Sequence, residues 1–98
     1  MGAEKWNELG RVHAGWAEWP AAQECFEAAI TAEPGWPALW ANLALAAARN
    51  GDPATAEGAL LMADTLDPAQ ALRWRQVLAS GRPLVVGDPG IERGGQVG

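Results

Sequence analysis

The chain has 98 residues, of which 49% are hydrophobic and 19% charged, and its formal net charge at pH 7 is −5. This length is enough for one small domain and no more. The acidic balance argues against a nucleic-acid backbone as the main partner, because phosphate binding requires a basic face.

The cysteine content and the length of the apolar segments bear on the cellular location of the protein. Cys25 is the only cysteine, so no internal disulfide can form and nothing requires an oxidising compartment. Residues 1–15 carry scattered charges and no continuous apolar run, which is unlike a signal peptide. The longest apolar stretch, residues 43–48, is far too short to span a membrane. We therefore expect a cytoplasmic protein that binds neither nucleic acid nor membrane.

Apolar periodicity and helix-breaking residues predict five helices. They are expected over about residues 3–14, from Pro20 to before Pro34, from Pro37 to Asn50, from Pro53 to before Pro68, and over about residues 69–80. Pro20 and Pro53 suit the first turn of a helix, where the N–H that proline lacks would have no partner. Asp52 directly before Pro53 is typical of an N-cap.

Tryptophan and proline recur at one interval along the chain. Trp6, Trp40 and Trp74 are evenly spaced, and Pro34 and Pro68 keep the same spacing; we call it the repeat interval. A fixed period of about 34 residues marks units that cannot bury their apolar faces alone and must stack on one another. Since each indole can bury roughly 150–250 Å², the three periodic rings are predicted to anchor the core.

Two successive units also carry matching motifs. The first reads Trp6-x-x-Leu9-Gly10-x-x-His13, then Ala22-x-x-x-Phe26, then Ala29 and Pro34. The second reads Trp40-x-x-Leu43-Ala44-x-x-Ala47, then Ala56-x-x-x-Leu60, then Ala63 and Pro68. A third begins at Trp74-x-x-Val77-Leu78 and is broken by Gly81, Arg82 and Pro83. This pattern resembles the tetratricopeptide repeat (TPR), with His13 at a place where that family prefers tyrosine.

The resemblance implies an all-α fold of antiparallel helical hairpins stacked as a short right-handed superhelix. It covers residues 3–80, with repeat 1 at about 3–36, repeat 2 at about 37–70 and a capping helix at about 69–80. Residues 81–98 are rich in glycine and proline, a composition that predicts a flexible tail. The apolar strip at residues 84–86 is compatible with a disordered terminus, with packing on the domain, or with docking to another chain.

Few residues offer catalytic chemistry. His13 and Cys25 lie in different helices of one hairpin, and two such groups cannot complete a zinc site. We interpret His13 as a packed, hydrogen-bonded histidine and Cys25 as a small buried or half-buried thiol. Carboxylates pair at solvated helical spacings, namely Glu24 with Glu27 and Asp64 with Asp67. We expect no enzymatic activity, no cofactor and no metal.

The family resemblance places function in the shape of the surface, because the first helices of TPR units line a concave groove that holds an extended peptide or a partner helix. Transferred to this chain, the peptide-binding groove consists of Asn7, Arg11, Asn42, Leu45, Arg49, Arg75 and Gln76, with Glu8, Ala79 and Arg82 beside them. Four of the seven Lys and Arg residues lie in this set. That segregation favours a partner peptide that bears carboxylates, and the other interpretation is that these residues only keep the face soluble.

Further alternatives follow from the same residues. The carboxylate clamp of co-chaperone TPR domains is matched here only at Asn42, so we do not expect that type of binding. A second hypothesis is a structural or assembly protein that self-associates weakly through the ends of the array. Among the tryptophans outside the main period, Trp16 and Trp19 are expected to pack, while Trp36 is left open between packing and exposure.

Overall fold

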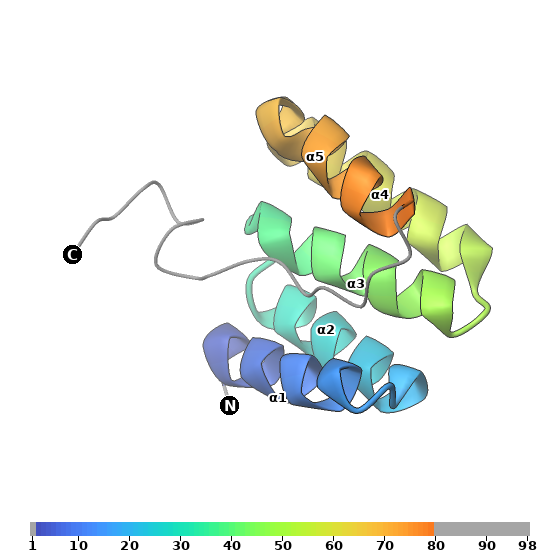
Figure 1. Cartoon of the computed structure of the whole chain (residues 1–98). Coiled ribbons are helices and arrows are strands. Elements are labelled where there is room, and N and C mark those ends of the chain that lie inside the picture. The colour runs from blue at the N-terminus through green and yellow to red at the C-terminus, as the bar shows by residue number, and fades with distance from the viewer. Residues whose placement is uncertain (1, 80–98) are drawn as a thin grey trace.

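The computed structural model describes residues 2–79. This part of the chain consists of five helices and holds no strand (Figure 1): α1 (Ala3–Gly15), α2 (Trp19–Ala32), α3 (Pro37–Arg49), α4 (Pro53–Leu66) and α5 (Pro68–Ala79). The predicted all-α fold is confirmed, and each helix begins and ends close to its predicted bounds. Arg82 and the predicted tail at residues 81–98 lie outside the described residues.

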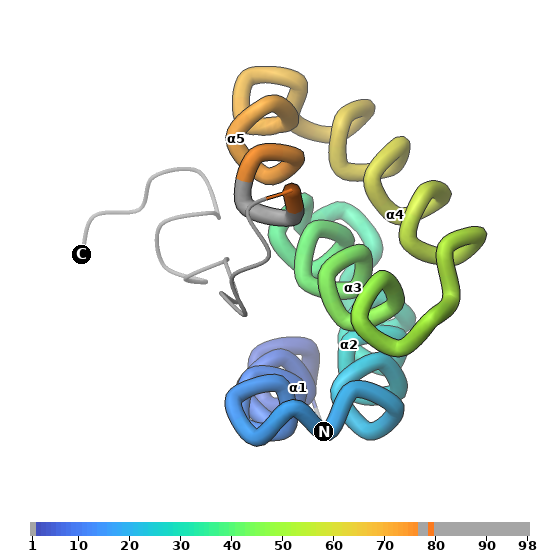
Figure 2. The backbone as a smooth tube through the Cα atoms, turned by 45° about the vertical axis from the view of Figure 1, so that its right-hand side comes forward, coloured from blue at the N-terminus to red at the C-terminus, as the bar shows by residue number. Residues whose placement is uncertain are grey.

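The helices form antiparallel hairpins that stack on one another. α1 pairs with α2 and α3 pairs with α4, each through a short turn, and α5 follows beyond α4 (Figure 1). Figure 2 shows α3 in the middle of this stack, between the α1–α2 hairpin and α5. The arrangement leaves one open end at α1 and another at α4 and α5.

The turns repeat at the interval that the sequence predicts. In the first turn the N–H of Glu18 donates to the carbonyl of His13 at 2.9 Å, and one repeat interval later that of Asp52 donates to the carbonyl of Ala47 at 2.8 Å. The residue before each donor has a positive φ, +58° at Ala17 and +76° at Gly51. The repeat interval is therefore a property of the backbone as well as of the side chains.

The second hairpin turn has the N-cap that the sequence predicts. Oδ1 of Asp52 accepts a hydrogen bond of 3.3 Å from the backbone N–H of Thr55, and Pro53 stands in the first turn of α4. Gly51 supplies the left-handed backbone conformation that reverses the chain, a conformation that glycine adopts without a Cβ clash. The same conformation at Ala17 carries a steric cost.

The three periodic tryptophans all contribute to the core. Trp74 is buried, and Trp6 and Trp40 are partly buried against core residues. Trp40 contacts both the main cluster around Phe26 and the smaller cluster that contains Trp74, and its indole N–H donates to the carbonyl of Pro34 at 2.8 Å. This ring therefore links the two parts of the core.

α3 is the most completely covered helix of the described chain. Every residue from position 41 to position 47 is buried, and so are Ala38 and Leu39. Consecutive buried positions point in every direction around a helix. The small alanines of α3 therefore allow close approach of neighbours on all of its sides.

The remaining tryptophans differ from one another. Trp36 is buried with 2% exposure, and Trp19 is partly buried against the core. Trp16, which we expected to pack, is 71% exposed, so that prediction is wrong. Its position explains the difference: Trp16 is the C-cap of α1, and the equivalent C-cap of α3, Asn50, is exposed as well.

Candidate functional site

The predicted groove residues come from α1, α3 and α5, as the sequence indicates, but the structure exposes them unequally. Arg11 and Gln76 are exposed, whereas Arg49 and Arg75 are half-buried. Asn7 and Asn42 have 0% exposure, and Leu45 has 2%. We expected these last three side chains on an open surface, and the structure buries them instead.

Asn7 and Asn42 form a buried polar pair that joins α1 to α3. Nδ2 of Asn42 donates a hydrogen bond of 2.9 Å to Oδ1 of Asn7. The other polar atom of each amide, Nδ2 of Asn7 and Oδ1 of Asn42, is buried without a hydrogen-bond partner. The pair thus leaves one donor and one acceptor unused, which is the complement of a single peptide group.

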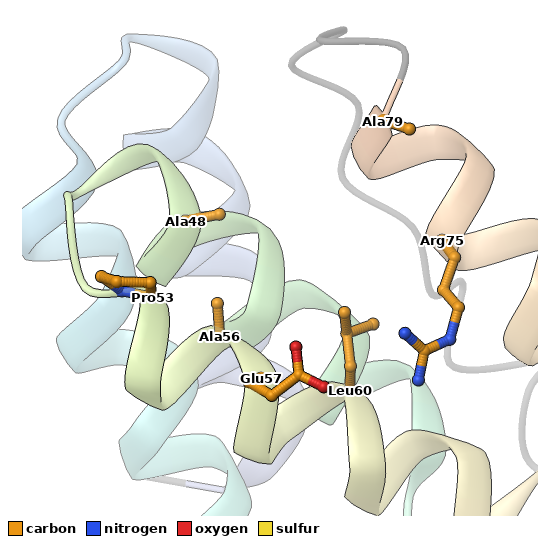
Figure 3. Close-up of a pocket in the computed structure, with 7 residues that line it drawn as sticks. All are labelled: Ala48, Pro53, Ala56, Glu57, Leu60, Arg75 and Ala79. Atoms are coloured by element: carbon orange, nitrogen blue, oxygen red, sulfur yellow. The ribbon is translucent and has the colours of Figure 1, made fainter.

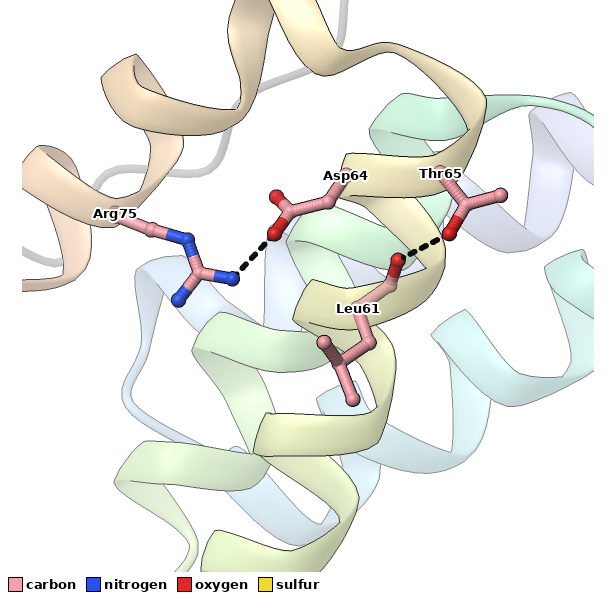
Figure 4. A network of polar contacts seen from close by, with 4 residues as sticks. All are labelled: Leu61, Asp64, Thr65 and Arg75. Carbon is pink, nitrogen blue, oxygen red and sulfur yellow. Dashed lines mark hydrogen bonds and ion pairs between the residues drawn. The ribbon is translucent and has the colours of Figure 1, made fainter.

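The guanidinium of Arg75 is engaged within the protein. It donates to Oδ2 of Asp64 on α4 (Figure 4), and this hydrogen bond raises the pKa of Arg75 above its ordinary value, with the charges of Asp64 and Glu57 adding to the rise. From the sequence we expected Asp64 at a solvated helical spacing. The pair with Arg75 could not be predicted, because the helical repeat alone does not fix how closely α5 approaches α4.

A side-chain to backbone hydrogen bond within α4 lies next to this ion pair. The hydroxyl of Thr65 donates to the carbonyl of Leu61 at 2.9 Å (Figure 4), and the equivalent hydroxyl of Thr31 donates to the carbonyl of Glu27 at 3.0 Å. Such bonds back to the preceding turn satisfy the hydroxyl within its own helix. Neither threonine is therefore arranged as a nucleophile.

A pocket of about 430 Å³ lies where α3, α4 and α5 meet (Figure 3). We call it the α4–α5 pocket, and its lining residues are Ala48, Pro53, Ala56, Glu57, Leu60, Arg75 and Ala79. The walls are mostly apolar, and Glu57 and Arg75 provide opposite charges. Of these residues only Arg75 and Ala79 were expected in or beside the groove, while Pro53, Ala56 and Leu60 were predicted as helix-start and repeat-motif residues.

In the first repeat, the position equivalent to Glu57 is occupied by Gln23. Gln23 lies buried between the two hairpins. Its amide donates to Oδ2 of Asp52 at 3.0 Å and accepts from Nδ2 of Asn50 at 2.9 Å. Hydrogen bonds from Thr55 and from Gln23 lower the pKa of Asp52. Gln23 therefore fastens the α3–α4 turn to α2, while Glu57 is exposed.

His13 and Cys25 are the residues with the most reactive side chains. His13 is half-buried, and its Nδ1 is 2.6 Å from Oε1 of Glu18, a contact within one turn. Cys25 is buried in α2 as a free thiol, and burial raises its pKa, with a further contribution from the charge of Glu24. A thiol with a raised pKa is a poor nucleophile at neutral pH.

Within residues 2–79, no group of three or more His, Cys, Asp and Glu side chains could hold a metal ion. None of the five described helices combines the length and the apolar character of a membrane span. Comparison with family models gave no match, and neither the curated proteins nor the solved structures gave one. The site must therefore be interpreted from its own geometry.

Proposed function

We propose that this chain is a non-catalytic protein-interaction module of the TPR type, an adaptor or scaffold that holds a peptide or a partner helix along α1 and α3. Two observations support the family assignment: the sequence motifs recur at the repeat interval, and so do the hydrogen bonds and positive φ angles of the hairpin turns. A cytoplasmic location is compatible with the free thiol of Cys25.

The observation that carries the proposal is the buried Asn7–Asn42 pair. A buried polar atom without a partner costs roughly 1–3 kcal/mol, and the pair holds two such atoms. An extended main chain laid across α1 and α3 supplies a carbonyl to Nδ2 of Asn7 and an N–H to Oδ1 of Asn42. Because both side chains have 0% exposure, binding includes a local opening of this face.

The arginines of the proposed groove indicate the charge of the ligand. Arg11 is exposed on α1 and Arg49 is half-buried on α3, and the third groove arginine, Arg75, pairs with Asp64. We assign the preference for a peptide with carboxylates to the guanidinium groups of Arg11 and Arg49. Their bonds to a carboxylate are charge-assisted and weaken as salt screens them.

The test is a binding measurement with short labelled peptides of acidic and of neutral composition, read by fluorescence polarisation. The double variant Arg11→Glu with Arg49→Glu should abolish the preference for acidic peptides. Arg73→Glu, an exposed position outside the proposed groove, is the matched control and should leave binding unchanged. Equal affinity of the double variant and the wild type for acidic peptides would remove the electrostatic part of the proposal.

The asparagine pair needs its own variant. Asn7→Leu with Asn42→Leu removes both unpartnered atoms together with the hydrogen bond that joins them, and side chains of similar size keep the helices apart. We expect this variant to stay folded and to lose affinity for acidic and neutral peptides alike. Undiminished binding by the folded variant would show that the pair does not hold the ligand.

A second candidate function is favoured by the two ends of the array. The outward face of α1 exposes Leu9, Val12 and Trp16, and the opposite end exposes Leu61 and Leu72. Exposed apolar side chains at both ends are what self-association of the array would cover.

A further inference from the structure

The α4–α5 pocket corresponds to a place that is filled in the first repeat. Three of its lining residues are smaller than the residues one repeat interval earlier: Pro53 stands in place of Trp19, Leu60 in place of Phe26, and Ala79 in place of Leu45. Phe26 and Leu45 are 0% and 2% exposed, and Trp19 packs against the main core cluster. The pocket is therefore space that larger side chains occupy at the first interface between repeats.

Two equivalent alanines show how this difference affects exposure. Ala14 in α1 and Ala48 in α3 are one repeat interval apart. Ala14 is 1% exposed, whereas Ala48 is exposed and lines the pocket (Figure 3). Since the two side chains are identical, the difference comes from their surroundings. The fold covers this position in the first repeat, and no residue between positions 2 and 79 covers it in the second.

We propose that Leu84, Val85 and Val86 of this same chain dock in the α4–α5 pocket. These three residues are the apolar strip, and they form the longest apolar run between positions 80 and 98. Their aliphatic side chains match the aliphatic walls that Ala56 and Leu60 provide, and docking would remove both surfaces from water. The strip would thus supply the apolar bulk that the first repeat takes from its own larger side chains.

The covalent connection favours this occupant over a separate molecule. Ala79 lines the pocket, and Leu84 follows it by five residues. Five extended residues span at most about 17 Å, so the strip can reach the pocket from the end of α5. Gly81 and Pro83 lie between them, and these residue types end helices and turn the chain. A tether of this length holds the strip near the pocket at an effective concentration on the order of millimolar, which a separate partner would have to match.

The charges beside the pocket and beside the strip are opposite. Glu57 lines the pocket, and Arg75, which also lines it, pairs with Asp64. Two carboxylates and one guanidinium leave one negative charge at this place. Arg82 stands two residues before Leu84, so docking of the strip brings a guanidinium within reach of the carboxylate of Glu57. Such a bond is charge-assisted and would help to orient the strip.

The docked strip would cover the end of the array that α4 and α5 leave open. Stacked repeats require a terminal unit that shields their last apolar face from water. In this chain a short segment that follows α5 would serve as that cover. Docking requires no peptide along α1 and α3, so it can be tested separately from the proposed function.

The test uses NMR spectroscopy on the full chain and two variants that each remove one side of the contact. Leu84→Ser with Val85→Ser and Val86→Ser removes the apolar strip. Leu60→Phe with Ala79→Leu fills the pocket with the side chains of the first repeat. In the wild type, methyl NOEs should connect the strip to Ala48, and the amide heteronuclear NOE values of residues 84–86, which report motion on the picosecond to nanosecond timescale, should match those of α5. Both variants should lose the methyl contacts and show lower heteronuclear NOE values.

Matched controls separate docking from general effects. Ile91→Ser replaces an apolar residue outside the strip, and Leu61→Phe enlarges a side chain of α4 that is 54% exposed and does not line the pocket. Both should behave like the wild type, and circular dichroism should show unchanged helicity in every variant. Wild-type residues 84–86 without contacts to Ala48, or an ordered strip in the filled-pocket variant, would overturn the proposal. Contacts that disappear on dilution would place the strip in a second copy and would overturn it as well.

Discussion

The ring of Phe26 lies directly against Gly10, so the first hairpin closes where α1 has no side chain. A Cβ at Gly10 would lie 2.7 Å from Cδ1 and 2.8 Å from Cζ of that ring, distances that no packed methyl group tolerates. The glycine is therefore required by close approach of α2 rather than by backbone conformation.

Gly10→Ala should destabilise the protein by about 1–3 kcal/mol, because overpacking outweighs the gain in helix propensity. Gly58→Ala is the control, since a Cβ at Gly58 meets nothing within 4 Å, and it should stabilise the protein by about 0.5–1 kcal/mol. Urea unfolding followed by circular dichroism measures both. If the free energy of unfolding changed in the same direction in both variants, the close packing of Phe26 on Gly10 would be contradicted.

The two left-handed turn residues give a second matched pair. Ala17→Gly should stabilise the protein by about 0.5–1 kcal/mol, because the steric cost of its φ of +58° exceeds the added entropy of the unfolded chain. Gly51→Ala, at the equivalent position with φ of +76°, should destabilise it by about 1 kcal/mol. Thermal unfolding of both variants measures whether stability rises or falls. A less stable Ala17→Gly protein would show that this turn is not strained.

Trp40→Ala should lower the free energy of unfolding by about 3–5 kcal/mol. The ring joins the two core clusters and donates its N–H to Pro34, so its removal opens a cavity and leaves a carbonyl without its donor. Trp16→Ala, at a position 71% exposed, should change stability by no more than about 0.5 kcal/mol in the monomer. Equal losses in the two variants, measured by urea unfolding at low protein concentration, would be inconsistent with the core described above.

The N-cap of α4 should make stability depend on pH in a defined direction. Hydrogen bonds lower the pKa of Asp52 in the folded protein, so its charge stabilises the fold above the unfolded value of about 3.9. That stabilisation is lost as the pH falls through the folded pKa. The wild type should therefore be more stable than Asp52→Asn by a constant difference from pH 7 to about pH 5, and the difference should shrink below about pH 4. Urea unfolding at a series of pH values measures it, and a difference that persists at pH 2 would contradict the assignment.

The sequence predicts the helices well because their ends are marked by local chemistry. Pro53 after Asp52, and Gly51 before it, define the second turn without any knowledge of the fold. The interval between Trp6, Trp40 and Trp74 likewise predicts that all three rings pack. These features depend on neighbours in sequence or on the repeat, and both can be read directly from the chain.

Other features depend on distances between helices, which the repeat does not set. Trp16 and Trp36 both lie at helix ends, and nothing local in the sequence shows that the first is exposed and the second buried. The register of α1 and α3 brings Asn7 and Asn42 onto one face, yet their burial follows from how closely the two helices approach. The pairing of Arg75 with Asp64 depends in the same way on the position of α5.

The burial of α3 on every side also bears on how the protein loses its structure. Both hairpins and the last helix share this one element, so none of them can detach without uncovering it. The described chain should consequently melt in a single all-or-none step instead of unravelling one repeat at a time.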